Sequence, residues 1–113
     1  MAAGVLGKAI ILIKGDSAIF DVTPMHTDGT PYEPQEGDRL VFVLKKHDED
    51  ETPLLEIPIP IDVMAVEFLP SDTSDLPAGK VDGRYRYYVE LTRNDGWVDT
   101  FINNANFLLL NKA

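Results

Sequence analysis

The sequence predicts an all-β protein, a single antiparallel β-sandwich with one short helical turn. Three observations predict it. Apolar residues recur at every second position in most of the apolar runs. Gly, Asp, Asn and Pro residues, which favour turns, separate these runs at short intervals. The chain has 113 residues, 44% of them hydrophobic and 26% charged, which suits one globular domain with a core of its own.

The expected strands follow one another with short connections. They cover about residues 9–13, 17–24, 39–46, 54–59, 63–69, 84–93, 97–102 and 105–110. Residues 1–8 are expected to be a flexible N-terminal segment, so the domain itself spans 9–113. Seven or eight short strands in about 100 residues are typical of an immunoglobulin-like (Ig-like) sandwich.

The first three strands combine alternation with Gly-Asp turns. In "SAIFDVT" (17–23) the apolar residues share one face, with Ile19 as the exception. In "RLVFVLKK" (39–46) both faces are apolar, which is typical of a central strand that is covered on one side and partly covered on the other. Gly15–Asp16 and Gly37–Asp38 precede these two strands and are expected to form turns.

The next two strands are marked by prolines. In "LLEIPIPID" (54–62) isoleucines alternate with Pro58 and Pro60, and a proline cannot donate to a β-ladder, so this strand is expected at a sheet edge or to be irregular. The run "VMAVEFL" (63–69) favours a strand over a helix because it is short and rich in β-branched and aromatic residues. One helical turn is expected near 71–76, with Ser71 as its N-cap.

The C-terminal part contains the clearest strand, "RYRYYVELT", in which Tyr85, Tyr87, Val89 and Leu91 alternate with more polar residues. Asn94–Asp95–Gly96 then predicts a hairpin, since these residues tolerate a positive φ. The expected core draws on one aromatic residue from most strands, namely Phe20, Phe42, Phe68, Tyr87, Phe101 and Phe107.

Charge and composition exclude several classes of function. A net charge of −9 disfavours nucleic acid and anionic membranes as partners. Without cysteine, the chain can form no disulfide, no thiolate metal site and no thiol nucleophile. The apolar run 9–13 is too short to cross a bilayer, and the N-terminus does not have the pattern of a secretion signal.

Candidate catalytic and metal-binding residues do not form a recognisable pattern. His26 and His47 fall in loops without an evident nucleophile. The acidic run "HDEDET" (47–52) offers Asp48, Asp50 and Glu51 as oxygen ligands for Ca²⁺, but it lacks the spacing of an EF-hand, so a solvated loop is expected. The sequence predicts no catalytic residue, no metal site and no cofactor.

Polar and aromatic clusters have structural explanations as well. The hydroxyls of "SDTSD" (71–75) suit helix capping, and "AGKVDG" (78–83) has the wrong spacing for a phosphate-binding loop. Tyr88, Trp97 and Tyr32 are the aromatic residues that could form an exposed platform for a sugar or a protein, whereas the other tyrosines of 84–93 are expected to face the core.

Several turn sequences resemble those of one family. These are "LIKGDSAIFDV", "DGTPYEPQEGDRLVFVLKK", "FLPSDTSDLPAGK" and "YRYYVELTRNDGWVDTFI", which together extend over about residues 9–111. They are similar to short Ig-like domains encoded in tail and baseplate regions of phages and prophages of Gram-positive bacteria, related to the N-terminal domain of the baseplate upper protein. In this chain "VDGR" (81–84) separates Lys80 from Tyr85, where relatives run directly into the Tyr-x-Tyr strand, so the preceding loop is expected to be larger. Tyr85 or Tyr87 is expected to act as the tyrosine corner of an Ig-like sandwich.

The resemblance implies a non-enzymatic structural protein of a phage or prophage virion, a tail- or baseplate-associated module that acts through protein–protein contacts. Its expected partners are other phage structural proteins, with a homo-oligomer as a further arrangement, and its expected location is the virion or the bacterial cytoplasm. Residues 9–13 or 105–110 are the expected edges for pairing with a neighbour. One alternative is a module that binds carbohydrate or a host surface through Tyr88 or Trp97. Another is a small enzyme or Ca²⁺-dependent protein that uses the 47–51 loop.

Overall fold

The structure is a computed structural model that describes residues 2–5, 9–22, 30, 32–47 and 49–111. These residues form eight strands and one short helix. In chain order the elements are β1 Ala2–Val5, β2 Ile10–Ile13, β3 Ala18–Asp21, β4 Arg39–Lys45, β5 Leu55–Ile59, β6 Ala65–Phe68, α1 Pro70–Thr73, β7 Arg84–Thr92 and β8 Val98–Leu110. The predicted all-β class is confirmed.

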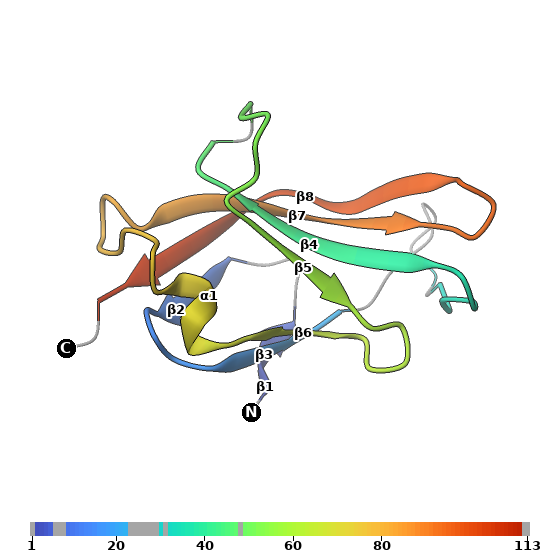
Figure 1. The fold of residues 1–113 in the computed structure, drawn as a ribbon, viewed down its shortest axis with the longest axis horizontal. Helices are drawn as coiled ribbons and strands as arrows, with labels where there is room; N and C mark the ends of the chain where they lie inside the picture. The colour runs from blue at the N-terminus through green and yellow to red at the C-terminus, as the bar shows by residue number, and fades with distance from the viewer. Residues whose placement is uncertain (1, 6–8, 23–29, 31, 48, 112–113) are drawn as a thin grey trace.

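The strands form two sheets. The larger sheet is curled and has the order β2-β8-β7-β4-β5, and the smaller has the order β1-β3-β6. Figure 1 shows β4, β7 and β8 in one layer and β3 and β6 in the other. The prediction of purely antiparallel sheets is wrong, because β1 runs parallel to β3 and β2 runs parallel to β8. Both parallel pairs involve the N-terminal strands, which lie at sheet edges.

The core lies between the two sheets and is largely aromatic. Phe68 of the smaller sheet lies 5.2 Å from Phe42 and 5.8 Å from Phe107 of the larger sheet, measured between ring centroids. Phe20 meets Phe68 edge-on at 5.8 Å, and Tyr87 stacks on Phe42 at 5.1 Å. The predicted core is confirmed for these five residues, while the side chain of Phe101 lies outside the described part.

The two margins of the larger sheet agree only in part with expectation. The proline-containing strand β5 is an edge, as predicted, and Pro58 is exposed on it. Residues 9–13 form the other edge through β2. Residues 105–110 are not an edge, because they belong to β8, which pairs with β2 on one side and with β7 on the other.

The structure also contains a strand, β1, within residues 1–8. Two other local predictions need correction. The two strands predicted at 97–102 and 105–110 are one strand, β8, with a bulge at Asn103 and Asn104, where Asn104 adopts a φ of 50°. The helix N-cap is Leu69, not Ser71, because Pro70 suits the first helical position and the Asp72 carboxylate accepts a hydrogen bond from the Leu69 N–H at 2.7 Å.

The additional residues 81–84 extend the pairing of β7 with β8. The Gly83 C=O accepts a hydrogen bond from the Leu109 N–H at 2.7 Å, and the Gly83 N–H donates to the Gly79 C=O at 2.9 Å. A Cβ atom at Gly83 would lie 1.9 Å from the Leu109 carbonyl oxygen, so the position requires glycine. The segment is therefore a tight, paired turn.

Candidate functional site

The two histidines do not form a catalytic centre among the described residues. His47 is exposed at the end of β4, and its backbone N–H donates to Asp50 Oδ2 at 3.0 Å. His26 lies outside the described residues. Within the described ranges, no group of three or more His, Asp or Glu side chains is placed to hold a metal ion.

The polar side chains of 71–75 support the local fold. Thr73 is fully buried, and its Oγ1 accepts a hydrogen bond from the Gly15 N–H at 3.1 Å. The Ser74 hydroxyl donates to the Ser71 C=O at 3.1 Å. These hydroxyls close the helical turn and attach it to the turn after β2. The sequence suggested capping here but did not reveal the long-range contact with Gly15.

The aromatic candidates do not form one platform. Trp97 is 61% exposed at the tip of the β7–β8 hairpin, opposite Arg93, whereas Tyr88 is half-buried in the middle of β7. Five residues of extended chain separate Tyr88 from Arg93, which corresponds to about 17 Å. Tyr32 lies near the hairpin with its ring centre 5.1 Å from Arg93 Cζ, and its hydroxyl donates to Asp38 Oδ2 at 2.5 Å.

Asp38 is the centre of a buried polar cluster, whereas the sequence predicted only that Gly37–Asp38 forms a turn. Its carboxylate also accepts hydrogen bonds from the backbone N–H groups of Gln35 and Asn94, both at 2.8 Å. The Gln35 and Tyr32 hydrogen bonds hold the pKa of Asp38 below its usual value. The bond to the Asp38 carboxylate raises the pKa of Tyr32. These hydrogen bonds tie the loop before β4 to the β7–β8 hairpin.

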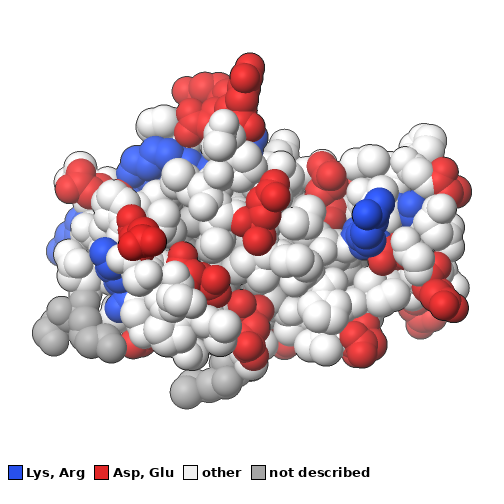
Figure 2. All heavy atoms as spheres, viewed as in Figure 1, with Lys and Arg blue, Asp and Glu red and all other residues white. Residues whose placement is uncertain are grey.

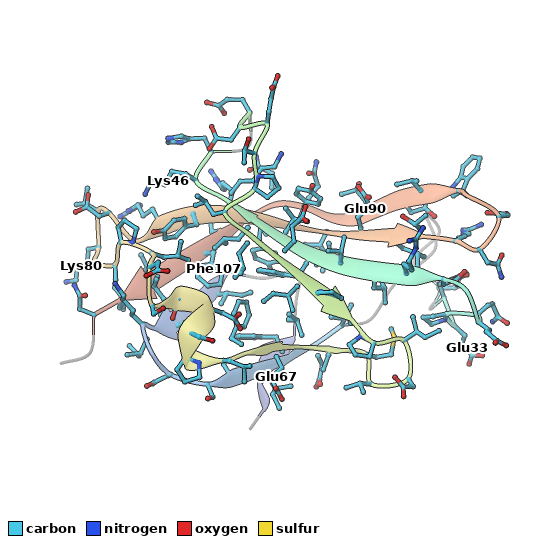
Figure 3. The ribbon with its side chains drawn as sticks, in the orientation of Figure 1. Glu33, Lys46, Glu67, Lys80, Glu90 and Phe107 are labelled. Atoms are coloured by element: carbon cyan, nitrogen blue, oxygen red, sulfur yellow. The ribbon has the colours of Figure 1, made fainter. Side chains whose placement is uncertain are left out.

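The most distinctive surface is a groove with a volume of about 540 Å³ across β2, β8 and β7. We call it the basic groove. Its charged and apolar lining includes Ile11, Lys46, His47, Val81, Arg84 and Arg86, and none of the described residues that line it is Asp or Glu. Chain-wide, acidic residues outnumber basic ones by 19 to 10. Lys46 lies at the base of the β4–β5 loop (Figure 3). The groove therefore has the opposite charge to most of the molecule.

The groove cations are held in place by neutral groups. The Lys46 ammonium donates to the carbonyl oxygens of Asp82 at 2.8 Å and Arg84 at 2.9 Å, and it lies 4.6 Å from the centre of the Tyr85 ring. Arg84 Nε donates to the Lys80 C=O at 2.7 Å. Arg86 donates to Asn106 Oδ1 at 2.5 Å. Their positive charges are thus positioned without being paired with a carboxylate of the described residues.

A second, smaller hollow continues the basic groove along β7. It has a volume of about 120 Å³ and is lined by Lys45, Arg86, Tyr87, Tyr88, Asn103 and Asn104. Arg86 borders both hollows, and the Lys45 ammonium lies 5.4 Å from the centre of the Tyr88 ring. The sequence did not predict this basic surface, although the alternation in "RYRYYVELT" places Arg84 and Arg86 together on the face away from the core.

Comparison of the chain with models of protein families and with curated protein sequences finds no match. Within the described residues, no helix is long and apolar enough to cross a membrane. The fold and the basic groove are therefore the observations from which a function is argued.

Proposed function

We propose that the chain is a non-enzymatic Ig-like module of a phage or prophage tail or baseplate, which acts by binding other structural proteins. The virion context comes from the resemblance of its turn sequences. The observation that carries the Ig-like assignment is the strand order. An Ig-like sandwich has a sheet with the order G-F-C, extended by C′ in variable-type domains, and a second sheet in which B and E are neighbours. Strands β8-β7-β4-β5 follow the order G-F-C-C′, and β3 and β6 are neighbours as B and E are.

A tyrosine in the expected position supports the same assignment. The Tyr85 hydroxyl at the start of β7 donates to the Pro77 C=O at 2.5 Å, eight residues earlier in the chain. This matches a tyrosine corner, in which a Tyr near the start of strand F bonds to the preceding connection. Tyr87, two residues later, takes the place of the cysteine of antibody domains and contributes its ring to the aromatic core.

Strand β2 provides a suitable contact edge. It pairs only with β8 among the described strands, and its Ile11 side chain is 65% exposed. The Lys14 N–H donates to the Leu110 C=O, so the backbone groups of Lys14 face β8. Because the backbone groups of successive residues in a strand point to alternate sides, those of Ile11, three residues earlier, face away from β8. An incoming strand could bond to them, as in β-strand addition. The opposite edge, β5, is blocked by Pro58.

The proposal is tested on phage particles. Lysates of induced cells that carry the gene would be fractionated by density-gradient centrifugation, and the particles would be labelled with an antibody raised against this chain. We expect the antibody to label tails or baseplates in electron micrographs. If the chain is fully expressed but is found only in the fraction without particles, this result contradicts the proposal.

A further inference from the structure

The basic groove and the acidic residues of the β4–β5 loop are neighbouring patches of opposite charge. The groove reaches from β2 to Lys46 and His47, where this loop begins, and the loop continues into Glu49, Asp50 and Glu51. Figure 2 shows the acidic atoms of this loop at the top of the molecule, with basic atoms below them on the left. Matching patches at different places on one surface allow copies of the chain to bind each other head to tail.

Among the described residues, neither patch contains an ion pair. The one ion pair among the described residues joins Arg93 to Asp99 on the hairpin far from both patches. Glu49 and Glu51 are exposed, and Asp50 accepts the His47 N–H, so the loop acids do not pair with the groove cations of the same copy. The charges on both sides therefore remain available to a partner.

The apolar groups beside the charges also match. In the groove Ile11 is 65% exposed and Val81 is 78% exposed, and beside the acidic loop Leu54 is 46% exposed. Burying apolar surface would add a favourable contribution that does not depend on salt. Each patch thus combines charge with an apolar contact, as an interface requires.

The strand register places the patches at the same level along the sheet. Lys45, at the end of β4 where the acidic loop begins, lies opposite Arg86 of β7, and Arg86 lies opposite Asn106 of β8. The next residue, Phe107, pairs with Ile10 of β2. A second copy shifted sideways would bring its acidic loop to the level of the groove, in a contact through side chains that does not require its Pro58-containing strand β5 to pair with β2.

We propose that the basic groove beside β2 binds the acidic β4–β5 loop of a second copy of this chain. This inference rests on the proposed function, because it names the partner for the contact edge of an assembly module. A symmetric dimer through β2 would bring the two basic grooves to the same interface and leave both acidic loops outside it. A head-to-tail contact pairs unlike charges and, unlike a symmetric dimer, repeats into a ring or a filament.

The test uses charge reversal on each side of the contact. The groove variant carries Arg84→Glu and Arg86→Glu, and the loop variant carries Glu49→Lys and Glu51→Lys. Sedimentation velocity across a concentration series should show the unmodified chain forming species larger than a dimer. Each variant alone should associate about tenfold more weakly than the unmodified chain, or more weakly still. An equimolar mixture of the two should associate again, because each then offers the complement of the other.

Matched controls separate this contact from a general effect of charge. Arg39→Glu changes a cation at the other end of β4, and Glu67→Lys changes an exposed acid on β6 of the smaller sheet. Both should associate like the unmodified chain. Thermal unfolding of every variant checks that it is folded, and the mixture provides a gain of association that a misfolded variant would not give.

Three results would overturn the inference. One is a chain that stays monomeric at every concentration; labelled tails in the particle experiment would still support the proposed function. Another is a dimer that is weakened by the groove variant and unaffected by the loop variant, since this would indicate a symmetric contact. Association that persists in both variants would likewise contradict it.

Discussion

Asp38 joins its own loop before β4 to the β7–β8 hairpin, which is distant along the chain. Its carboxylate accepts hydrogen bonds from Tyr32, from the turn at Gln35 and from Asn94 in the β7–β8 hairpin. The φ of Gly37 is 90°, and a Cβ atom there would lie 2.9 Å from Asn94 Cβ, so this turn approaches the hairpin closely. One buried acid thus fixes how the loop before β4 meets the end of β7.

Asp38→Asn should make the protein less sensitive to acid while lowering its stability at neutral pH. The folded-state pKa of Asp38 is depressed, so its stabilisation is present above the unfolded-state pKa of about 3.9. That stabilisation is lost as the pH falls through the lower folded-state pKa. Urea unfolding at a series of pH values should show the difference between the two proteins shrinking towards acid pH. A difference that grows towards acid pH would contradict this role.

Tyr85→Phe isolates the hydroxyl that joins β7 to the preceding loop. The hydroxyl of this buried residue donates to the Pro77 C=O, and removing it leaves that acceptor without this partner. We expect a loss of about 1 kcal/mol in the free energy of unfolding. Tyr88→Phe is the matched control, because the Tyr88 hydroxyl forms no hydrogen bond with a described residue. Equal effects of both substitutions on urea unfolding would argue against the tyrosine corner.

At the level of elements, alternation located the strands, but it could not determine their partners. "RLVFVLKK" was predicted as a central strand because both of its faces are apolar, and β4 does lie between β7 and β5. The parallel pairing of β2 with β8 was not predictable, since it depends on segments about 97 positions apart (Ile10 and Phe107). The bulge in β8 was missed because "NNAN" reads as a turn, whereas Asn104 can adopt a positive φ inside a strand.

Gly83 offers a test of the turn that precedes β7. In Gly83→Ala the new methyl group would collide with the Leu109 backbone, which cannot move without breaking the pairing of β8. We expect a destabilisation of about 3 kcal/mol or more, measured by chemical denaturation. Gly15→Ala is a useful comparison, because Gly15 has a φ of 87° but open space around it, and it should cost only about 1–2 kcal/mol. A smaller effect at Gly83 than at Gly15 would contradict the tight turn.

At the scale of the whole molecule, Phe68 joins the two sheets into one folding unit. Its ring is fully buried and contacts Phe20 in its own sheet and Phe42 and Phe107 in the other. The sequence predicted these rings as core residues from alternation alone, since each lies on the more apolar side of its strand. It could not show that Phe68 touches both sheets, because that depends on how the sheets stack.

Phe68→Ala should therefore destabilise the entire fold. Replacing a buried Phe by Ala costs about 3–5 kcal/mol, a large part of the roughly 5–15 kcal/mol that stabilises a typical domain. We expect the tyrosine near-ultraviolet circular dichroism and the far-ultraviolet signal to be lost together at a much lower urea concentration. Val63→Ala is the control: Val63 is 62% exposed, and its substitution should change the stability by less than about 0.5 kcal/mol. If only one signal were lost in Phe68→Ala, the sheets would unfold separately, and the aromatic cluster would not be what unites them.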